Sequence, residues 1–431
     1  MTRKTIRIEV PVLTRVEGEG ALELDIQNGK LQSLRLRIYE PPRLFEKLLE
    51  GRPYTEVPDI VARICGICPV AYQMSAVQAI ENIFQLNPEP WVRAMRRLLY
   101  CGEWIESHAL HIHLLALPDF LGFDSIIGMA EKYPDEVRRG LKLQQLGNRI
   151  IERIGGRSVH PVSVRAGGFT AAPKQEDMQT LRVNLEAALQ DAEALLRWTC
   201  TLSLPNDEQS FTCVALHHPD EYPMNEGRIH SDSGLDIAID QYPQHFHELQ
   251  VPHSTALHSH LQGKPYLVGP LARINLNYEQ LPDQIKKLLE QSGIHFPSKN
   301  MFHSIIARAT EVYFAMLEAV RILQNYQLPL QSFAQASPKA GVGVGCTEAP
   351  RGILWHRFEL DAAGNVSNAI IIPPTSQNQA RIEEDLKIAL EKFGLDQDDD
   401  AIRKLGEALI RNYDPCISCA THFLTMKVQR T

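Results

Sequence analysis

Cysteine is scarce in this sequence, with eight residues in 431, too few for the disulfide framework of a small secreted domain. Neither sign of charge is in large excess, since 44 Lys and Arg stand against 52 Asp and Glu. The net charge of −8 gives no basic excess to attract nucleic acid. Long apolar runs are also missing, and Pro118 and Asp119 interrupt the best candidate, Leu114 to Phe123. The sequence therefore predicts no nucleic-acid partner and no membrane span.

Residues 1–20 have charged residues within every apolar stretch, so they do not resemble a secretory signal. Pairs of cysteines in the spacing CxxC more often bind metal or carry out redox chemistry in proteins that are not exported. These two features together predict a cytoplasmic protein.

The spacing of apolar residues predicts an α+β fold that is predominantly helical. Alternating apolar residues over about 5–38, with a turn at Asn28-Gly29, predict an N-terminal β-meander. A helical body over about 42–326 is expected, and residues 205–277 within it are rich in His, Pro, Ser and Gly and predict loops with a few strands. The helices predicted in this body are residues 69–84, 91–117, 136–154, 175–203 and 302–326, together with a short one at 44–49.

The last part of the chain, about 340–422, is predicted to contain a second hairpin and two helices. The hairpin covers residues 357–372 around Gly364-Asn365, and the helices cover 379–393 and 400–412. With no internal repeat and no clear linker, residues 1–422 are expected to form one domain.

Two CxxC pairs lie near opposite ends of the chain, Cys65-Gly-Ile-Cys68 and Cys416-Ile-Ser-Cys419. Two cysteines at i and i+3 can direct both sulfurs at one ion, and thiolates select zinc, copper, iron or nickel over magnesium or calcium. From spacing alone, the favoured interpretation is a closed four-cysteine zinc or iron site that ties the two ends of the chain together.

The residues beside both pairs suggest that the thiols are ionised. Asp414 is predicted to be an N-cap and Pro415 the first residue of a helix, which would place the second pair in a first helical turn. The first pair directly precedes Pro69 and a helical pattern. Since a helix N-terminus lowers the pKa of a thiol, both pairs are expected to be thiolates.

Six motifs occur along nearly the whole chain, in the order Thr14 to Gly18, Arg63 to Cys68, His160-Pro161 to Gly167-Gly168, Glu348-Ala-Pro-Arg351-Gly352, Pro374-Thr375, and Asp414 to His422. Together they resemble the large, catalytic subunit of nickel-iron hydrogenases. The cytosolic character and the sequence that follows Cys65 are most similar to the soluble sulfhydrogenase or NADP-linked branch, as an alpha subunit.

This resemblance implies a binuclear Ni-Fe centre held by the four cysteines, with cyanide and carbon monoxide on the iron. It makes Cys65 and Cys416 terminal nickel ligands and Cys68 and Cys419 the bridges to iron. In the family's reaction dihydrogen is split into protons and electrons, and Cys416 is then the base in contact with the metal. Glu17 maps onto the family's proton gate, because a buried carboxyl can relay protons near the working pH.

The remaining motifs correspond to residues around the centre. Arg351 maps onto a cation over the open metal position, and Thr375 with Pro374 lies in a loop that donates hydrogen bonds to the diatomic ligands on iron. Glu46, the backbone carbonyl of about Ile371 and His422 correspond to ligands of a second ion, Mg²⁺ or Fe²⁺. Residues 423–431 correspond to a propeptide that a maturation endopeptidase removes after nickel is loaded.

The resemblance also implies partner subunits. The chain has no further cysteine set for an iron-sulfur cluster, so an iron-sulfur small subunit is expected to carry the electrons. In the soluble branch, flavin and iron-sulfur subunits that react with NAD(P) are expected as well.

Several features leave alternatives open. Tyr72 stands where many relatives have a histidine. The rival hypothesis is a non-enzymatic four-cysteine zinc or structural scaffold related to the hydrogenase-like subunits of complex I, although those relatives lack the cysteine pairs. Ten further cysteines and histidines are interpreted as packed or solvated residues rather than as metal ligands. They are Cys101, Cys200, Cys213, Cys346, His108, His111, His113, His253, His258 and His260.

Overall fold

The computed structural model describes residues 5–421, and its helices and strands form an α+β fold with more helix than strand. Three regions of apolar core organise it. The first lies among the long helices and extends to the two cysteine pairs, and the second lies between the N-terminal sheet and the last two helices. The third lies between residues 214–268 and the sheet near residues 346–372. The predicted fold class is confirmed.

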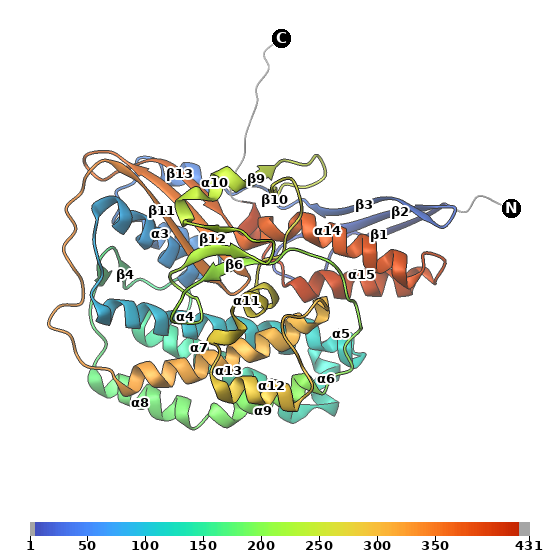
Figure 1. The fold of residues 1–431 in the computed structure, drawn as a ribbon, viewed down its shortest axis with the longest axis horizontal. Coiled ribbons are helices and arrows are strands. Elements are labelled where there is room, and N and C mark those ends of the chain that lie inside the picture. Colours follow the sequence, from blue (N-terminus) through green and yellow to red (C-terminus); the bar gives the residue numbers. More distant parts are fainter. Residues whose placement is uncertain (1–4, 422–431) are drawn as a thin grey trace, which may run out of the picture.

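Long helices form the lower layer in Figure 1, with α4, α7 and α13 side by side. Gly102 of α4 and Gly147 of α7 allow this approach, because a Cβ on either glycine would collide with the backbone of the other helix. The elements of this layer are α4 (Pro90–Leu110), η2 (His111–Ala116, π-helical), α5 (Leu117–Leu121), α6 (Ile126–Lys132), α7 (Pro134–Gly155), α8 (Gln175–Glu186), α9 (Leu189–Cys200), α12 (Asp283–Gln291) and α13 (Ser304–Gln324).

An antiparallel sheet in the order β11-β12-β13 packs on α3 above these helices (Figure 1). The predicted hairpin over residues 357–372 is confirmed as β12 and β13. The neighbouring strand β11 was missed, and its sequence Gly341-Val-Gly-Val-Gly345 explains why. Side chains at Gly343 and Gly345 would collide with the carbonyl oxygens of Ala79 and Ser75 in α3, so glycine is required where a strand lies directly on a helix. The elements are α1 (Phe45–Leu49), α2 (Val57–Val61), η1 (Ala62–Ile64), α3 (Pro69–Phe84), β11 (Gly341–Ala349), β12 (Gly352–Leu360) and β13 (Val366–Ile372).

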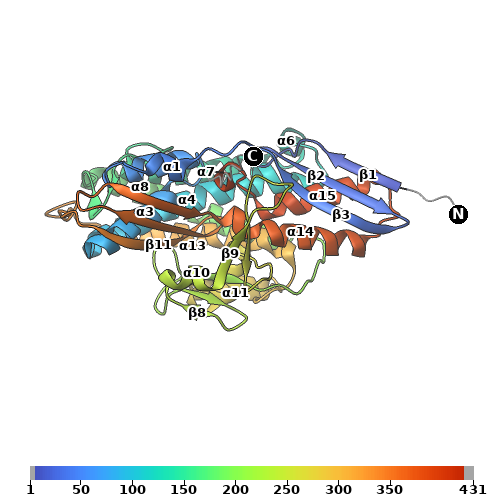
Figure 2. The same cartoon turned by 90° about the horizontal axis from the view of Figure 1, so that it is seen from above.

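The N-terminal meander β1-β2-β3 lies against α14 and α15, as seen at the right of Figure 1 and from above in Figure 2. The predicted meander is confirmed. Helix α14 begins five residues before its predicted start, at Pro374. The elements are β1 (Thr5–Val10), β2 (Gly20–Gln27), β3 (Lys30–Ile38), α14 (Pro374–Phe393), α15 (Asp399–Tyr413) and η6 (Ser418–Ala420).

Residues 205–277 form short antiparallel strands and helix α11, which agrees with the prediction of loops with a few strands. Figure 2 shows this region projecting to one side of the long helices. The elements from residue 164 to residue 303 that are not named above are β4 (Val164–Arg165), β5 (Gly168–Phe169), β6 (Val214–His217), β7 (Arg228–Ser231), β8 (Asp236–Ile237), η3 (Ile239–Gln241), α10 (Tyr242–His245), β9 (Phe246–Leu249), β10 (His258–Leu261), α11 (Pro270–Asn277), η4 (Tyr278–Gln280) and η5 (Met301–His303).

No single helix within residues 5–421 is long and apolar enough to cross a membrane. One pair, Pro90–Leu121 with Ile126–Lys132, meets the length and composition criteria jointly but is bent by 76°.

Candidate metal centre

The four cysteines of the two CxxC pairs meet at one buried point. Their sulfur atoms all lie within 4.8 Å of one another. Cys65 Sγ is 3.5 Å from Cys416 Sγ, and Cys68 Sγ is 3.8 Å from Cys419 Sγ. Cys416 and Cys419 are joined as a disulfide in this structure, and as thiolates they complete a set of four. The site therefore offers a thiolate set suited to a soft transition metal.

The first pair lies in the tight segment between η1 and α3. Helix α3 begins at Pro69, a favoured first residue, and Glu103 of α4 accepts hydrogen bonds from Val70 N (2.6 Å) and Ala71 N (3.0 Å). Ile67 N and Cys68 N each donate to Cys65 Sγ at 3.3 Å. This packing fixes both sulfurs before any metal binds.

The two thiols of this pair differ in acidity. The hydrogen bond between them lowers the pKa of Cys65 and raises the pKa of Cys68 well above its usual range. Without a metal, the hydrogen bond between the two buried sulfurs therefore favours the ionised form of Cys65 over that of Cys68, and the prediction of two thiolates stays a prediction for the metal-bound site. A metal that binds both sulfurs must displace the proton of that hydrogen bond.

The second pair does not begin a helix, so that prediction is wrong. Asp414 ends α15 in the left-handed conformation, with φ of 58°, which is common just after the last residue of a helix. Cys416 instead lies in a short parallel bridge with Glu17, and Cys419 is in the 3₁₀ turn η6. Cys416 N donates to Thr375 Oγ1 at 3.0 Å.

Glu17 lies beside this second pair. Its backbone oxygen accepts from Ile417 N and its Oε2 accepts from Ser418 N, both at 3.0 Å. The next residue, Gly18, has φ of +87°, and a Cβ there would collide with Ile417 and Ser418. The glycine therefore lets the Glu17 segment lie directly on the cysteine segment.

Arg351 lies next to the cysteines and is buried. Its Nε donates to the Asp414 carbonyl oxygen at 2.7 Å, and its Nη2 donates to Asp414 Oδ1 at 2.9 Å. Its Nη1 is buried without a hydrogen-bond partner among residues 5–421. Burial acts to raise the pKa of Asp414, but the charges of Arg351, His111 and Arg308, together with the hydrogen bond from Arg351, lower it below its usual range. The pair is thus ionised, with one guanidinium N–H left unused.

Tyr72, one turn after Cys68 on α3, is a second unused donor. Its hydroxyl is buried with no hydrogen-bond partner among the described residues. Burial, and after it the charges of Cys68 and Cys65, raise its pKa well above the usual range. Two unsatisfied donors near four thiolates fit a metal group that carries its own acceptor ligands, which a plain four-cysteine zinc ion lacks.

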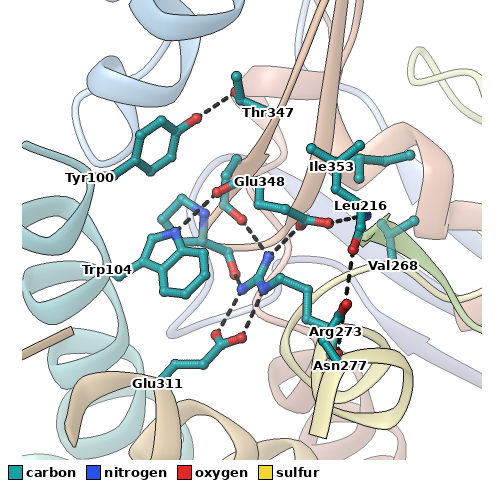
Figure 3. A network of polar contacts seen from close by, with 12 residues as sticks. Tyr100, Trp104, Leu216, Val268, Arg273, Asn277, Glu311, Thr347, Glu348 and Ile353 are labelled. Atoms are coloured by element: carbon teal, nitrogen blue, oxygen red, sulfur yellow. Dashed lines mark hydrogen bonds and ion pairs between the residues drawn. The ribbon is translucent and has the colours of Figure 1, made fainter. Parts of the chain in front are cut away.

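A buried polar network holds the Glu348 to Arg351 segment (Figure 3). Arg273 of α11 donates to both oxygens of Glu311 at 2.8 Å, to Glu348 Oε2 at 2.8 Å and to the carbonyl of Pro350 at 2.8 Å. Trp104 Nε1 donates to the Glu348 carbonyl at 3.0 Å. Burial acts to raise the pKa of Glu311, but Arg273 lowers it to about 2. The network therefore fixes the backbone that presents Arg351.

Sequence reasoning missed Arg273, Glu311 and the partnership of Asp414 with Arg351. The available signal was weak: Arg273 and Glu311 are charged residues at buried positions of apolar helices. Nothing in their spacing connects them to the motif at Glu348.

Two carboxyl groups lie beside the start of α14. Glu46 of α1 accepts from Ile371 N at 2.7 Å, and burial raises its pKa to about 7. Burial and the Glu46 charge raise the pKa of Glu248 to about 8, and Ser376 Oγ donates to Glu248 at 3.3 Å. The structure thus brings Glu46 and Ile371 together, whereas His422 lies outside the described residues. Pro374 and Thr375 belong to the first turn of α14 rather than to a loop.

The predicted packed histidines differ among themselves. His108, His111 and His113 are buried, and each makes a hydrogen bond, to Glu311, to the carbonyl of Arg411 and to the carbonyl of Ala109. His253 and His258, in contrast, meet Glu383.

The fold and the site together define a metalloprotein with a buried four-thiolate centre at the junction of its two chain ends. The family model of nickel-dependent hydrogenases matches residues 43–140 and 244–422. The chain belongs to this family of nickel-dependent hydrogenases.

Individual relatives agree with this family. The chain is 33% identical to the sulfhydrogenase 1 subunit alpha of Pyrococcus furiosus, over 97% of this chain and 98% of that protein. It is 32% identical to the sulfhydrogenase 2 subunit alpha of the same organism, over 97% and 100%. A crystal structure of an NAD⁺-reducing [NiFe]-hydrogenase has 26% identity and a TM-score of 0.90, covering 97% and 99% of the two chains. The resemblance expected from the motifs is confirmed.

Proposed function

We propose that this chain is the catalytic subunit that reversibly splits dihydrogen into protons and electrons at a Ni-Fe centre bound by Cys65, Cys68, Cys416 and Cys419. The observation that carries the proposal is the gathering of four buried sulfurs beside two unused hydrogen-bond donors. When bound, a Ni-Fe group with cyanide and carbon monoxide on iron supplies the heterolytic cleavage of dihydrogen.

The ligand roles rest on the resemblance, because the sulfur separations do not distinguish them: Cys416 and Cys419 are bonded to each other. Between the two CxxC motifs, Cys65 lies next to Cys416 and Cys68 next to Cys419. We assign the first pair as terminal nickel ligands and the second as bridges, which is the pairing implied by the resemblance.

Cys416 and Glu17 are proposed to move the proton. Cys416 is the base, and its chain segment is hydrogen-bonded along Glu17, so the carboxylate lies within the same local unit. A carboxylate held by one backbone N–H keeps a second oxygen for proton exchange. Protons would leave the site through Glu17.

Arg351 and Thr375 are proposed to act on the groups bound at the centre. The Arg351 guanidinium is anchored on two sides by Asp414, and this directs its remaining N–H without reorganisation. Thr375 accepts from Cys416 N, so its hydroxyl hydrogen is available to a diatomic ligand on iron. Pro374, the first residue of α14, fixes the backbone before Thr375.

A second ion, Mg²⁺ or Fe²⁺, is proposed at Glu46, the Ile371 carbonyl and His422. This proposal is supported by the half-buried carboxyls of Glu46 and Glu248. Burial raises the pKa of both, the Glu46 charge raises that of Glu248 further, and a divalent cation would offset this cost of ionisation. The nine residues 423–431 after His422 are proposed to be removed by a maturation endopeptidase.

Electrons released from dihydrogen require a partner subunit that carries them away from the metal centre. Within residues 5–421, Cys101, Cys200, Cys213 and Cys346 form no further ligand group. We therefore propose an iron-sulfur small subunit, and flavin and iron-sulfur subunits that exchange electrons with NAD(P). The names of the relatives support this proposal, since two of them are called subunit alpha and one solved relative is an NAD⁺-reducing enzyme.

The deciding experiment is infrared spectroscopy of the complex purified anaerobically from its native host. Metal-bound cyanide and carbon monoxide bands are expected together with bound nickel, and both should be lost in Cys416→Ser. Cys213→Ser, a buried cysteine outside the site, is the matched control and should keep them. Zinc at the four cysteines with no such bands would reject the proposal in favour of a structural scaffold.

A further inference from the structure

Two histidines and a glutamate meet at a second point of the molecule, away from the four cysteines. His253 follows strand β9, His258 begins β10, and Glu383 lies on α14. Their ligand atoms all lie within 4.8 Å of one another. Spacing in the sequence gave no sign of this group, because its third member is more than a hundred residues away.

The geometry of the three side chains converges on the carboxylate of Glu383. His253 Nε2 is 2.7 Å from Glu383 Oε1, and His258 Nε2 is 3.4 Å from Glu383 Oε2. The two imidazole rings are 5.7 Å apart between centroids and inclined at 76°. Ligands on a tetrahedral ion with bonds of about 2.0 Å lie roughly 3.3 Å apart, so small side-chain shifts suffice to admit an ion.

His258 is the clearest sign of a missing ligand. Its side chain is 3% exposed, its Nδ1 has no hydrogen-bond partner in the described part of the chain, and its Nε2 has a long contact of 3.4 Å with Glu383 Oε2. A buried polar group without a partner costs about 1–3 kcal/mol. Coordination through Nε2 would satisfy one of its two ring nitrogens.

The carboxylate is already oriented for such a role. Leu36 N, on strand β3, donates to Glu383 Oε1 at 2.8 Å. This bond holds one oxygen and leaves Oε2 facing His258, which is the arrangement that outer hydrogen bonds give to metal-binding carboxylates.

From these contacts we propose that His253, His258 and Glu383 bind a divalent transition-metal ion, with zinc as the best match. Two imidazoles and a carboxylate are a common zinc set with three protein ligands and one water. Thr375 and Glu383 are separated by about 12 Å along the axis of α14, so this site is distinct from the four-cysteine centre. The proposal does not depend on which metal the cysteines bind.

The ion would join the β9–β10 hairpin to helix α14, and strand β3 is linked to both by hydrogen bonds. Leu36 N of β3 donates to Glu383, and Thr255 N of the hairpin donates to the Ile38 carbonyl at 2.8 Å. The first turn of α14 holds Cys416 through Thr375, so the ion would stabilise the helix that supports the metal centre. A surface hollow of about 450 Å³, lined in part by Ser33, Glu383 and Lys387, gives a route from solvent.

The test is zinc binding by the complete complex. The complex is treated with a chelator, given ZnCl₂ in slight excess and freed of unbound ion, and zinc and nickel are then counted in the same sample. We expect wild type to retain one more zinc per nickel than His253→Gln and Glu383→Gln. His260→Gln is the matched control, since His260 is half-buried on the same strand β10 but is not one of the three residues, and it should retain that zinc.

Zinc X-ray absorption of the wild-type complex then identifies the ligands. Nitrogen and oxygen neighbours at about 2.0–2.1 Å that disappear in both variants support the site, whereas sulfur at about 2.3 Å would place the zinc at the cysteines and overturn it. Equal zinc content in wild type and both variants would also overturn it, and would leave the three residues as a hydrogen-bonded ion pair. Unchanged nickel content in the variants shows that the main centre has formed.

Discussion

Arg351 and Asp414 form a buried pair that joins the β11–β12 turn to the last turn before Cys416. The guanidinium contacts both the backbone carbonyl and the side chain of Asp414, and both side chains are at most 3% exposed. An arginine beside the four cysteines is thereby held by the segment that carries two of them. The position of the cation and the position of the cysteines are therefore set together.

Replacing Arg351 with Lys should show whether a positive charge at this position is enough for activity or whether the shape of the guanidinium group is also needed. Lysine keeps the positive charge but cannot bridge Asp414 on two sides and still present a free N–H. We expect hydrogen oxidation to fall about 10²–10³-fold, as for loss of one preorganised donor. Nickel content and the infrared bands should be retained. Arg357→Lys, a partly exposed arginine on the adjacent strand, is the control and should remain fully active; an Arg351→Lys enzyme of equal activity would disprove the role of Arg351.

Replacing Glu17 with Gln should interrupt proton transfer and leave the metal site assembled. The amide oxygen can still accept from Ser418 N, but the side chain can no longer take up a proton. Turnover should fall by about 10²–10⁴-fold, the usual contribution of a proton-transfer group. Nickel and iron content should not change.

The exposed neighbour Glu19 provides the control, because Glu19→Gln changes the same charge two residues away. If Glu17→Gln and Glu19→Gln both turn over at the wild-type rate, protons leave by another route.

The carboxyl pair near α14 predicts a dependence of magnesium binding on pH. Without a cation, Glu46 has its pKa raised to about 7 and Glu248 to about 8, so folding favours their protonated forms. Their contribution to stability is present below the unfolded value of about 4.5 and is lost as pH rises through about 7 to 8. Added Mg²⁺ should therefore raise the melting temperature more at pH 8 than at pH 6.

Thermal unfolding of the chelator-treated complex checks this dependence of the magnesium effect on pH. Glu46→Gln should abolish the difference between pH 6 and pH 8. Glu50→Gln removes an exposed carboxylate just after the same helix and should keep it. A magnesium effect that is equal at both pH values, or that survives in Glu46→Gln, would argue against a site at Glu46.

Arg273 should be essential for stability although it does not contact the cysteines. Arg273→Met leaves Glu311 and Glu348 buried with their cation removed, and breaking such a pair costs about 3–5 kcal/mol. Denaturant unfolding should show this loss, together with reduced nickel retention as the Glu348 to Arg351 segment loosens. Arg228→Met removes an exposed pair with Asp236 and should leave the free energy of unfolding almost unchanged. A stable, fully loaded Arg273→Met complex would show that the network does not position Arg351.

The sequence alone determined the elements whose signals are local. Apolar periodicity gave the N-terminal meander and the long helices, with α3 matched at both ends, because packing on one face imposes a period that the sequence must carry. The ordered motifs gave the four cysteines, Glu17, Glu46 and Arg351 as site residues. Strand β11 was not predicted, because its glycines, which are needed for contact with α3, remove the alternation of apolar and polar residues by which a strand is predicted.

Tertiary structure decided which of these residues meet and what state they are in. In the structure Asp414 is the partner of Arg351 and not the predicted N-cap. The pKa of Cys65 is lowered, whereas the pKa of Cys68 is raised. Tertiary structure also assembled Arg273 with Glu348, and His258 with Glu383, from distant parts of the chain. Such groups depend on burial and on contacts across many residues, and a period or spacing in the sequence does not encode them.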